Sequence, residues 1–210
     1  MAELKVGKIT LGAYMTNCYF VYREGESEVM FFDPADQGKY IYDKLTEKGF
    51  SIEAIFLTHG HYDHIGGAEE LRNISGAKIY CTEAEHVLLD DPYVNISANM
   101  HKKVTLKADA YINDGDILEY GSKKCKVITT PGHTIGGCCF YFEEAGILIC
   151  GDTLFAESIG RTDFPTGNMK KLLASVEEKL FVLPDDTRIY PGHGPASTIG
   201  HEKQFNPFFS

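Results

Sequence analysis

The sequence predicts an α+β fold in which β-sheets are covered by helices. Short apolar runs alternate with amphipathic segments along the whole chain, and hairpin-like runs are mixed with helical patterns. No Pro/Gly/Ser-rich linker or low-complexity tract divides the chain. Its 210 residues, 43% hydrophobic and 24% charged, are typical of a globular protein and suffice to bury a sizeable core. We therefore expect one domain spanning residues 1–210.

The individual elements follow from these patterns in chain order. The apolar runs predict strands at 4–10, 18–22, 28–32, 54–58, 78–81, 117–120, 124–129, 137–142, 146–150 and 187–190. The amphipathic segments predict helices at 38–48, 65–73, 82–89 and 168–181. In the last helix Leu172, Leu173, Val176 and Leu180 form one apolar stripe, and Asn168 is placed to cap its first turn.

Composition restricts the class of protein. The formal net charge of −10 disfavours a nucleic-acid-binding protein, which usually has a basic face. No apolar stretch is long enough to span a membrane, and the N-terminus lacks the apolar segment of a signal peptide, so we expect a cytoplasmic protein without a membrane partner.

The six cysteines include no C-x-x-C pair, and several lie in apolar runs. We expect them to be reduced and buried as small hydrophobic side chains, with a zinc–thiolate site or a catalytic thiol as the alternative. They are Cys18, Cys81, Cys125, Cys138, Cys139 and Cys150.

The strongest functional signal is the segment T-H-G-H-Y-D-H at 58–64, which places three histidines and one aspartate in six positions. On a tight turn after a strand, His59 and His61 can point the same way, while Asp63 and His64 can face a second point where the chain enters a helix. Glycines at 60, 66 and 67 permit the close backbone approach of such a turn. Imidazole and carboxylate ligands suit zinc, and also iron or manganese.

Three further ligand-type residues lie just beyond predicted strands, in glycine-containing turns. They are His133 in PGHT, Asp152 in GD and His193 in PGHG. Any one alone is typical of a structural turn. Together with the 59–64 cluster, they predict a metal site built from several strand ends.

In this order, the motifs H-x-H-x-D-H, a later His, G-D and a late G-H resemble the metallo-β-lactamase superfamily over essentially the whole chain. The resemblance implies a four-layer αββα sandwich with two metal ions, most simply zinc, at one edge of its sheets. It implies one ion on His59, His61 and His133, a second on Asp63, His64 and His193, and Asp152 as the bridge. It also implies that Asp33, at the end of VMFFD, supports the metal loop from behind. Thr58 and Thr134 beside the ligands are further supporting candidates.

The segments at 151–168 and 190–209 resemble the glyoxalase II (hydroxyacylglutathione hydrolase) branch, in particular its short bacterial members. This implies hydrolysis of an S-hydroxyacylglutathione thioester by a dimetal-bound hydroxide, with catalytic roles for Asp63 and Asp152. A thiol of pKa about 8.5 leaves readily as thiolate. One departure is evident. Glyoxalase II carries a C-terminal helical domain that contacts glutathione, whereas 17 residues follow His193 here.

Candidate contacts for this small-molecule substrate are Arg161, Phe155 and Lys102. Arg161 and Asp163 in GRTDF can form an ion pair that fixes the loop near the metals, or a solvent-exposed pair of little weight. Lys102 lies in the 92–111 segment, which forms either a rim over the site or a solvated face.

Other functions on the same scaffold remain open. A persulfide dioxygenase would hold one iron on His59, His133 and Asp152. A flavodiiron oxygen reductase typically has Glu where this chain has His61 and carries an additional flavin domain. Lactones, β-lactams or phosphodiesters could be hydrolysed at the same dimetal site, and a binding protein on a degenerate fold would be expected to lack some of the ligands.

Overall fold

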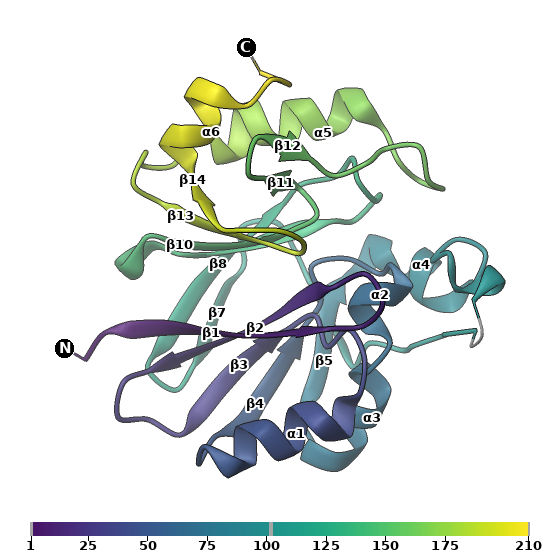
Figure 1. Cartoon of the computed structure of the whole chain (residues 1–210), viewed down its shortest axis with the longest axis vertical. Helices are drawn as coiled ribbons and strands as arrows, with labels where there is room; N and C mark the ends of the chain where they lie inside the picture. Colours follow the sequence, from purple (N-terminus) through teal and green to yellow (C-terminus); the bar gives the residue numbers. More distant parts are fainter. Residues whose placement is uncertain (1, 101–102, 210) are drawn as a thin grey trace.

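Two six-stranded sheets pack face to face, and helices cover the outer face of each sheet, so the fold has four layers (Figure 1). The structure is a computed structural model and describes residues 2–100 and 103–209. The α+β class and the αββα sandwich implied by the resemblance are confirmed.

The first sheet has the order β1-β2-β3-β4-β5-β6. Its first three strands pair antiparallel, and β3 to β6 run parallel. The strands are β1 (Leu4–Leu11), β2 (Thr16–Arg23), β3 (Glu28–Phe32), β4 (Ser51–Phe56), β5 (Lys78–Thr82) and β6 (Ala110–Ile112). Helices α1 (Gly38–Glu47) and α3 (Ala68–Ser75) cover the outer face, and the short helices α2 (Tyr62–Ile65) and α4 (His86–Asp90) follow β4 and β5.

The second sheet has the order β14-β13-β10-β9-β8-β7, antiparallel except for the parallel pair β10–β13. Its strands are β7 (Ile117–Tyr120), β8 (Lys123–Thr129), β9 (Cys138–Phe142), β10 (Ile147–Gly151), β13 (Arg188–Pro191) and β14 (Ser197–Thr198). A small hairpin, β11 (Leu154–Phe155) and β12 (Ser158–Ile159), follows β10. Helices α5 (Met169–Ser175) and α6 (Ile199–Phe205) cover the outer face.

The two-residue period of the strands explains why both faces of each sheet are buried. In β3, Val29 and Phe31 pack under the outer helices, while Met30 and Phe32 enter the core between the sheets. There the rings of Phe32 and Phe140 lie 5.0 Å apart, which joins the two sheets. The core between the sheets is largely apolar, although Lys123 of β8 is also buried, and the ligand-type residues lie where the strands end.

Each strand expected from the sequence overlaps a strand of the structure, whereas the short strands β6, β11, β12 and β14 and the helix α6 were not predicted. The helix expected at 65–73 is wrong as a single element. It is divided into α2 and α3 at Gly66-Gly67, where the Gly67 N–H donates to Pro34 O instead of continuing the helix (2.9 Å). The helix expected at 82–89 begins as a 3-10 turn before α4. The Asn168 cap is confirmed, since its side chain accepts from Lys171 N.

All six cysteines are free and buried, as expected. Burial raises the pKa of the Cys125 thiol to about 12, so it is protonated at neutral pH. Among residues 2–100 and 103–209, the helices are all too short or too polar to cross a bilayer.

Candidate metal centre

The turn between β4 and α2 carries the histidine cluster and is held by Asp33, the residue after β3. The buried Asp33 carboxylate accepts hydrogen bonds from Thr58 N (2.7 Å) and from the Thr58 hydroxyl (2.6 Å). Its Oδ2 also lies 2.9 Å from His64 Nδ1. Asp33 therefore links the start of the turn to its end, and its contact with Nδ1 leaves the Nε2 of His64 facing the other ligand-type residues.

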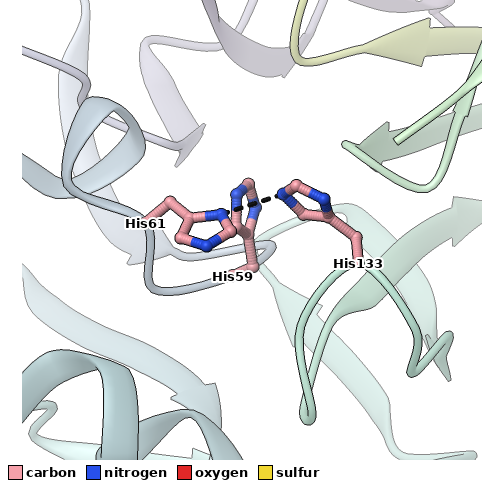
Figure 2. A group of neighbouring side chains, drawn as sticks. All are labelled: His59, His61 and His133. Carbon is pink, nitrogen blue, oxygen red and sulfur yellow. Dashed lines mark hydrogen bonds between the residues drawn. The ribbon is translucent and has the colours of Figure 1, made fainter. Parts of the chain in front are cut away.

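Three imidazoles converge in the first group: His59 and His61 from this turn, and His133 from the turn after β8 (Figure 2). One potential ligand atom from each lies within 4.8 Å of the other two. His61 Nδ1 is 2.9 Å from His133 Nε2. His133 Nδ1 donates to the main-chain oxygen of Arg161 (2.7 Å), which leaves its Nε2 as the nitrogen available to a metal ion.

The second group is Asp63, His64 and His193, again with one potential ligand atom each within 4.8 Å. His193 comes from the turn after β13, and its Nε2 lies 3.3 Å from Asp63 Oδ2. Its Nδ1 donates to the main-chain oxygen of Tyr14, in the turn between β1 and β2 (3.1 Å). The group is thus assembled from both sheets.

Asp152 lies between the two groups, directly after β10. Its Oδ2 is 3.6 Å from His133 Nε2 and 3.5 Å from His193 Nε2, and its Oδ1 is 3.4 Å from His64 Nε2. One carboxylate therefore faces both groups, the position that the resemblance implies for a bridging ligand.

The two groups differ in charge. Burial, reinforced by the neighbouring imidazoles, lowers the pKa of His61 to about 3 and that of His59 well below its usual value. Burial also lowers the pKa of His133, although Asp152 opposes it. All three are therefore neutral at physiological pH, the form that binds metal ions.

In the second group, the carboxylates of Asp63 and Asp152 together have the larger effect on the pKa values of the imidazoles. Burial acts to lower the pKa of His64 and of His193, but the adjacent carboxylates of Asp152 and Asp63 outweigh it and raise both. Burial acts to raise the pKa of the two carboxyl groups, yet the imidazoles hold both pKa values below their usual range. The second group is thus a mixed set in which the acids are ionised.

This ligand set fits divalent cations. The Nε2 atom of His59 is buried and has no hydrogen-bond partner among the described residues, while its Nδ1 lies 3.0 Å from the Thr58 hydroxyl. An unsatisfied buried polar atom costs about 1–3 kcal/mol, a cost that metal coordination would remove. Three imidazoles in one group, and imidazoles with carboxylates in the other, suit zinc, iron or manganese.

A third convergence, of Asp33 with His59 and His64, is also close enough for a metal ion. We interpret it as support for the turn, because the Asp33 oxygens are already occupied by Thr58 and His64 Nδ1.

Glu85 is a structural residue of the site that the sequence did not indicate. It is buried, and its carboxylate accepts from Gly60 N (2.6 Å), the Thr134 hydroxyl (2.7 Å) and Gly136 N (2.7 Å). It therefore ties the turn that carries His59 and His61 to the turn that carries His133. Nothing in the sequence distinguishes it from a solvent-exposed acid of the helix expected at 82–89.

Asn17 on β2 plays a similar part for the last ligand turn. Its buried side chain donates to Pro191 O and to Gly194 O, both at 3.0 Å, on either side of His193.

A cavity of about 500 Å³ opens beside the two groups and includes His61, Asp63, His133, Asp152 and His193 in its lining. Phe155 and Arg161, two of the expected substrate contacts, also line it, whereas Lys102 lies outside the described residues. The hydroxyl of Thr58 donates to Asp33, and that of Thr134 donates to Glu85. A larger groove of about 1150 Å³ borders β1 and includes no candidate ligand in its lining, so we assign the chemistry to the smaller cavity.

Comparison with known proteins gives one family. The model of the metallo-beta-lactamase superfamily matches residues 11–193. A protein of Bacillus subtilis named as a probable metallo-hydrolase is 35% identical over 209 residues, which cover 99% of this chain and 98% of that protein. The hydroxyacylglutathione hydrolase GloC of Haemophilus influenzae is 31% identical over 208 residues, 96% of each chain.

Solved structures of similar proteins have the same fold. The B3 metallo-beta-lactamase BLEG-1 superposes with a TM-score of 0.93 and 35% identity, and the match covers 98% of this chain and 100% of BLEG-1. TTHA1623, solved in a di-iron-bound form, gives a TM-score of 0.85 and 31% identity, with 96% and 99% coverage.

Proposed function

The chain belongs to the metallo-beta-lactamase superfamily, and on that premise we propose that it is a metal-dependent hydrolase of thioesters of the S-hydroxyacylglutathione type. The observation that carries the proposal is the convergence of two ligand groups with Asp152 between them. The named relatives support the hydrolase class, and GloC supports the thioester substrate.

In this proposal two divalent ions, which we take to be zinc among the metals that the ligands suit, would polarise the thioester carbonyl and lower the pKa of a water molecule toward neutrality. The first group would hold one ion with three neutral imidazoles. The second would hold the other with Asp63, His64 and His193, and Asp152 would contact both ions.

A residue of the chain can accept the proton that the attacking water molecule loses. Asp63 is ionised at neutral pH, since its pKa lies below the usual range, and it lines the cavity, so it is able to accept a proton there. The departing thiolate needs no proton donor, because a thiol has a pKa of about 8.5. The charge state of the site therefore favours a thioester over a substrate with a strongly basic leaving group.

The test is metal analysis of the purified protein combined with hydrolysis of S-lactoylglutathione. We expect two divalent ions per chain, and turnover that disappears on chelation and returns when the metal is restored. One iron per chain, no thioester turnover, and oxygen consumption with glutathione persulfide would contradict the proposal in favour of a dioxygenase using His59, His133 and Asp152.

A second candidate is β-lactam hydrolysis, favoured by the likeness to the B3 metallo-beta-lactamase BLEG-1. It uses the same attack on a carbonyl, but the nitrogen leaving group requires protonation. Measuring a cephalosporin and S-lactoylglutathione with one metal-loaded preparation ranks the two by kcat/KM.

A further inference from the structure

Ile96 has a backbone conformation that its side chain disfavours. Its φ is 72° and its ψ is 5°, in the left-handed region that glycine and asparagine adopt readily and β-branched residues rarely do. Strained backbone of this kind persists where the surroundings over-determine it, and it gathers at functional sites.

Asn95 holds Ile96 in this conformation. The buried Asn95 amide donates to Leu88 O and Val104 O, both at 2.9 Å, and its Oδ1 accepts from Ser97 N (3.0 Å). Its main-chain oxygen accepts from Tyr62 N, at the start of helix α2, which carries the candidate ligands Asp63 and His64 (3.1 Å). The strained residue is therefore fixed relative to the candidate metal ligands.

Ile96 lines the cavity beside the two ligand groups. The same cavity has apolar or aromatic side chains against both groups: the Phe164 ring centre is 5.8 Å from that of His61, and the Phe155 ring centre is 6.3 Å from that of His193. Tyr14 and Tyr62 pack edge to face at 5.7 Å. A carbonyl held at the ions would thus be surrounded by apolar walls.

These observations match one part of the proposed substrate. The glutathionyl carrier of an S-acylglutathione is a charged tripeptide, whereas its acyl group can be apolar. Burial of an apolar acyl group against apolar side chains is favourable. We propose that Ile96 is a specificity residue whose strained backbone places its side chain in an apolar wall that selects thioesters with a large apolar acyl group. The inference rests on the proposed function and narrows its substrate class.

The test compares S-mandeloylglutathione with S-lactoylglutathione, which differ by a phenyl group in place of a methyl group on the same 2-hydroxyacyl thioester. The metal-loaded protein should favour the mandeloyl substrate in kcat/KM by about tenfold or more, the scale of a few carbon atoms in an apolar pocket. Ile96→Asn should remove most of this preference and leave the thermal midpoint unchanged or higher, because asparagine tolerates the left-handed conformation. Ile96→Val, which keeps the branched apolar side chain, should retain it.

Gln37 provides the matched control, since it is exposed, lies outside the cavity and has a φ of 50°. Gln37→Asn relieves the same kind of strain and should leave the substrate ratio unchanged. Equal use of both thioesters by the unsubstituted protein, or an unchanged ratio in Ile96→Asn, overturns the role of Ile96. Absence of turnover with both thioesters overturns the proposed function, and this inference with it.

Discussion

The two sheets contribute to the candidate metal centre in different ways. The first sheet supplies four potential ligands from one segment of six residues, 59–64, which follows β4 and enters α2. The second sheet supplies His133, Asp152 and His193 from three separate turns, after β8, β10 and β13. The first half is a local motif, whereas the second half exists only once the second sheet has formed.

The support behind each half differs as well. In the first half, the carboxylates of Asp33 and Glu85 bind the turn. In the second half, His133 and His193 each donate to a main-chain oxygen, of Arg161 and of Tyr14 respectively. Side chains of Glu85 and Asn17 also hold the turns of the second half, but its two imidazoles are oriented by main-chain oxygens. Backbone displacement should therefore damage the second half more than the first.

The largest expected effect comes from Asp152, the one ligand candidate that faces both groups. Asp152→Asn keeps the shape but replaces an ionised carboxylate with a neutral amide. We expect the loss of at least one ion per chain and a fall in kcat/KM of more than about 100-fold, since even substitutions behind a ligand cost about 10–100-fold. Metal analysis and thioester hydrolysis measure both, and full activity with a full metal content would show that the halves are not joined through Asp152.

Asp163→Asn is the matched control for this variant. It removes a carboxylate from the same half of the molecule, but one that is exposed and pairs with Arg161. It should leave the metal content unchanged.

The next largest effect is expected from a side chain that displaces the backbone beside Asp152, and a substitution at Gly160 tests it. A Cβ at Gly160 would lie 1.8 Å from the main-chain oxygen of Asp152, whereas at Gly60, in the first half, the nearest atom would be Leu88 Cβ at 2.7 Å. We expect Gly160→Ala to destabilise the protein by about 3 kcal/mol or more, and Gly60→Ala by about 1–3 kcal/mol. Denaturant unfolding with metal removed measures the difference; a larger loss in Gly60→Ala would reverse the comparison.

The same contrast explains what the sequence could predict. The 59–64 segment was recognisable because its four ligand-type residues lie within six positions, whereas Asp33 was assigned only by the family resemblance. His133, Asp152 and His193 were each ambiguous alone. Together with the 59–64 cluster they predicted a metal site, and the family resemblance assigned each of them to an ion. The alternation of apolar residues likewise predicted the long strands, since a strand's period is local.

Residues whose role depends on tertiary contacts could not be predicted. Glu85 and Asn17 have polar side chains that become buried only when turns distant in sequence meet. The left-handed backbone of Ile96 is imposed by Asn95, and no propensity of isoleucine indicates it. The division of the 65–73 helix depended on Pro34 O, which accepts the Gly67 N–H.

Glu85 provides an intermediate effect. In Glu85→Gln, an amide NH2 replaces one of the carboxylate oxygens that accept hydrogen bonds in the native protein, so it faces a hydrogen-bond donor. The two ligand turns should therefore separate. We expect metal affinity to fall by about 10–100-fold, measured by competition with a chromophoric chelator. Unchanged affinity would show that Asp33 alone suffices to hold the first half.

Glu202 is the control, because it is an equally buried carboxylate with three donors but lies on α6, away from the ligands. It accepts from Glu157 N, Asn206 Nδ2 and the Ser197 hydroxyl. Both variants should lose about 1–3 kcal/mol of stability from unsatisfied buried groups. Only Glu85→Gln should weaken metal binding, which separates positioning of the ligands from general destabilisation.

The smallest effect is expected at Arg161, which adjoins Gly160 but differs in what it contributes. Its guanidinium donates to Asp163 at 2.8 and 2.7 Å and lies 3.7 Å from the Phe164 ring centre, yet 55% of the Arg161 side chain and 67% of the Asp163 side chain remain exposed. Such exposed pairs add little to stability. The contact with His133 is made by the main-chain oxygen, which Arg161→Ala retains. We therefore expect an unchanged thermal midpoint and metal content, with only a higher KM for the anionic thioester. Loss of metal in this variant would mean that the Arg161 side chain, and not only its main-chain oxygen, positions His133, and this distinction between the halves would fail.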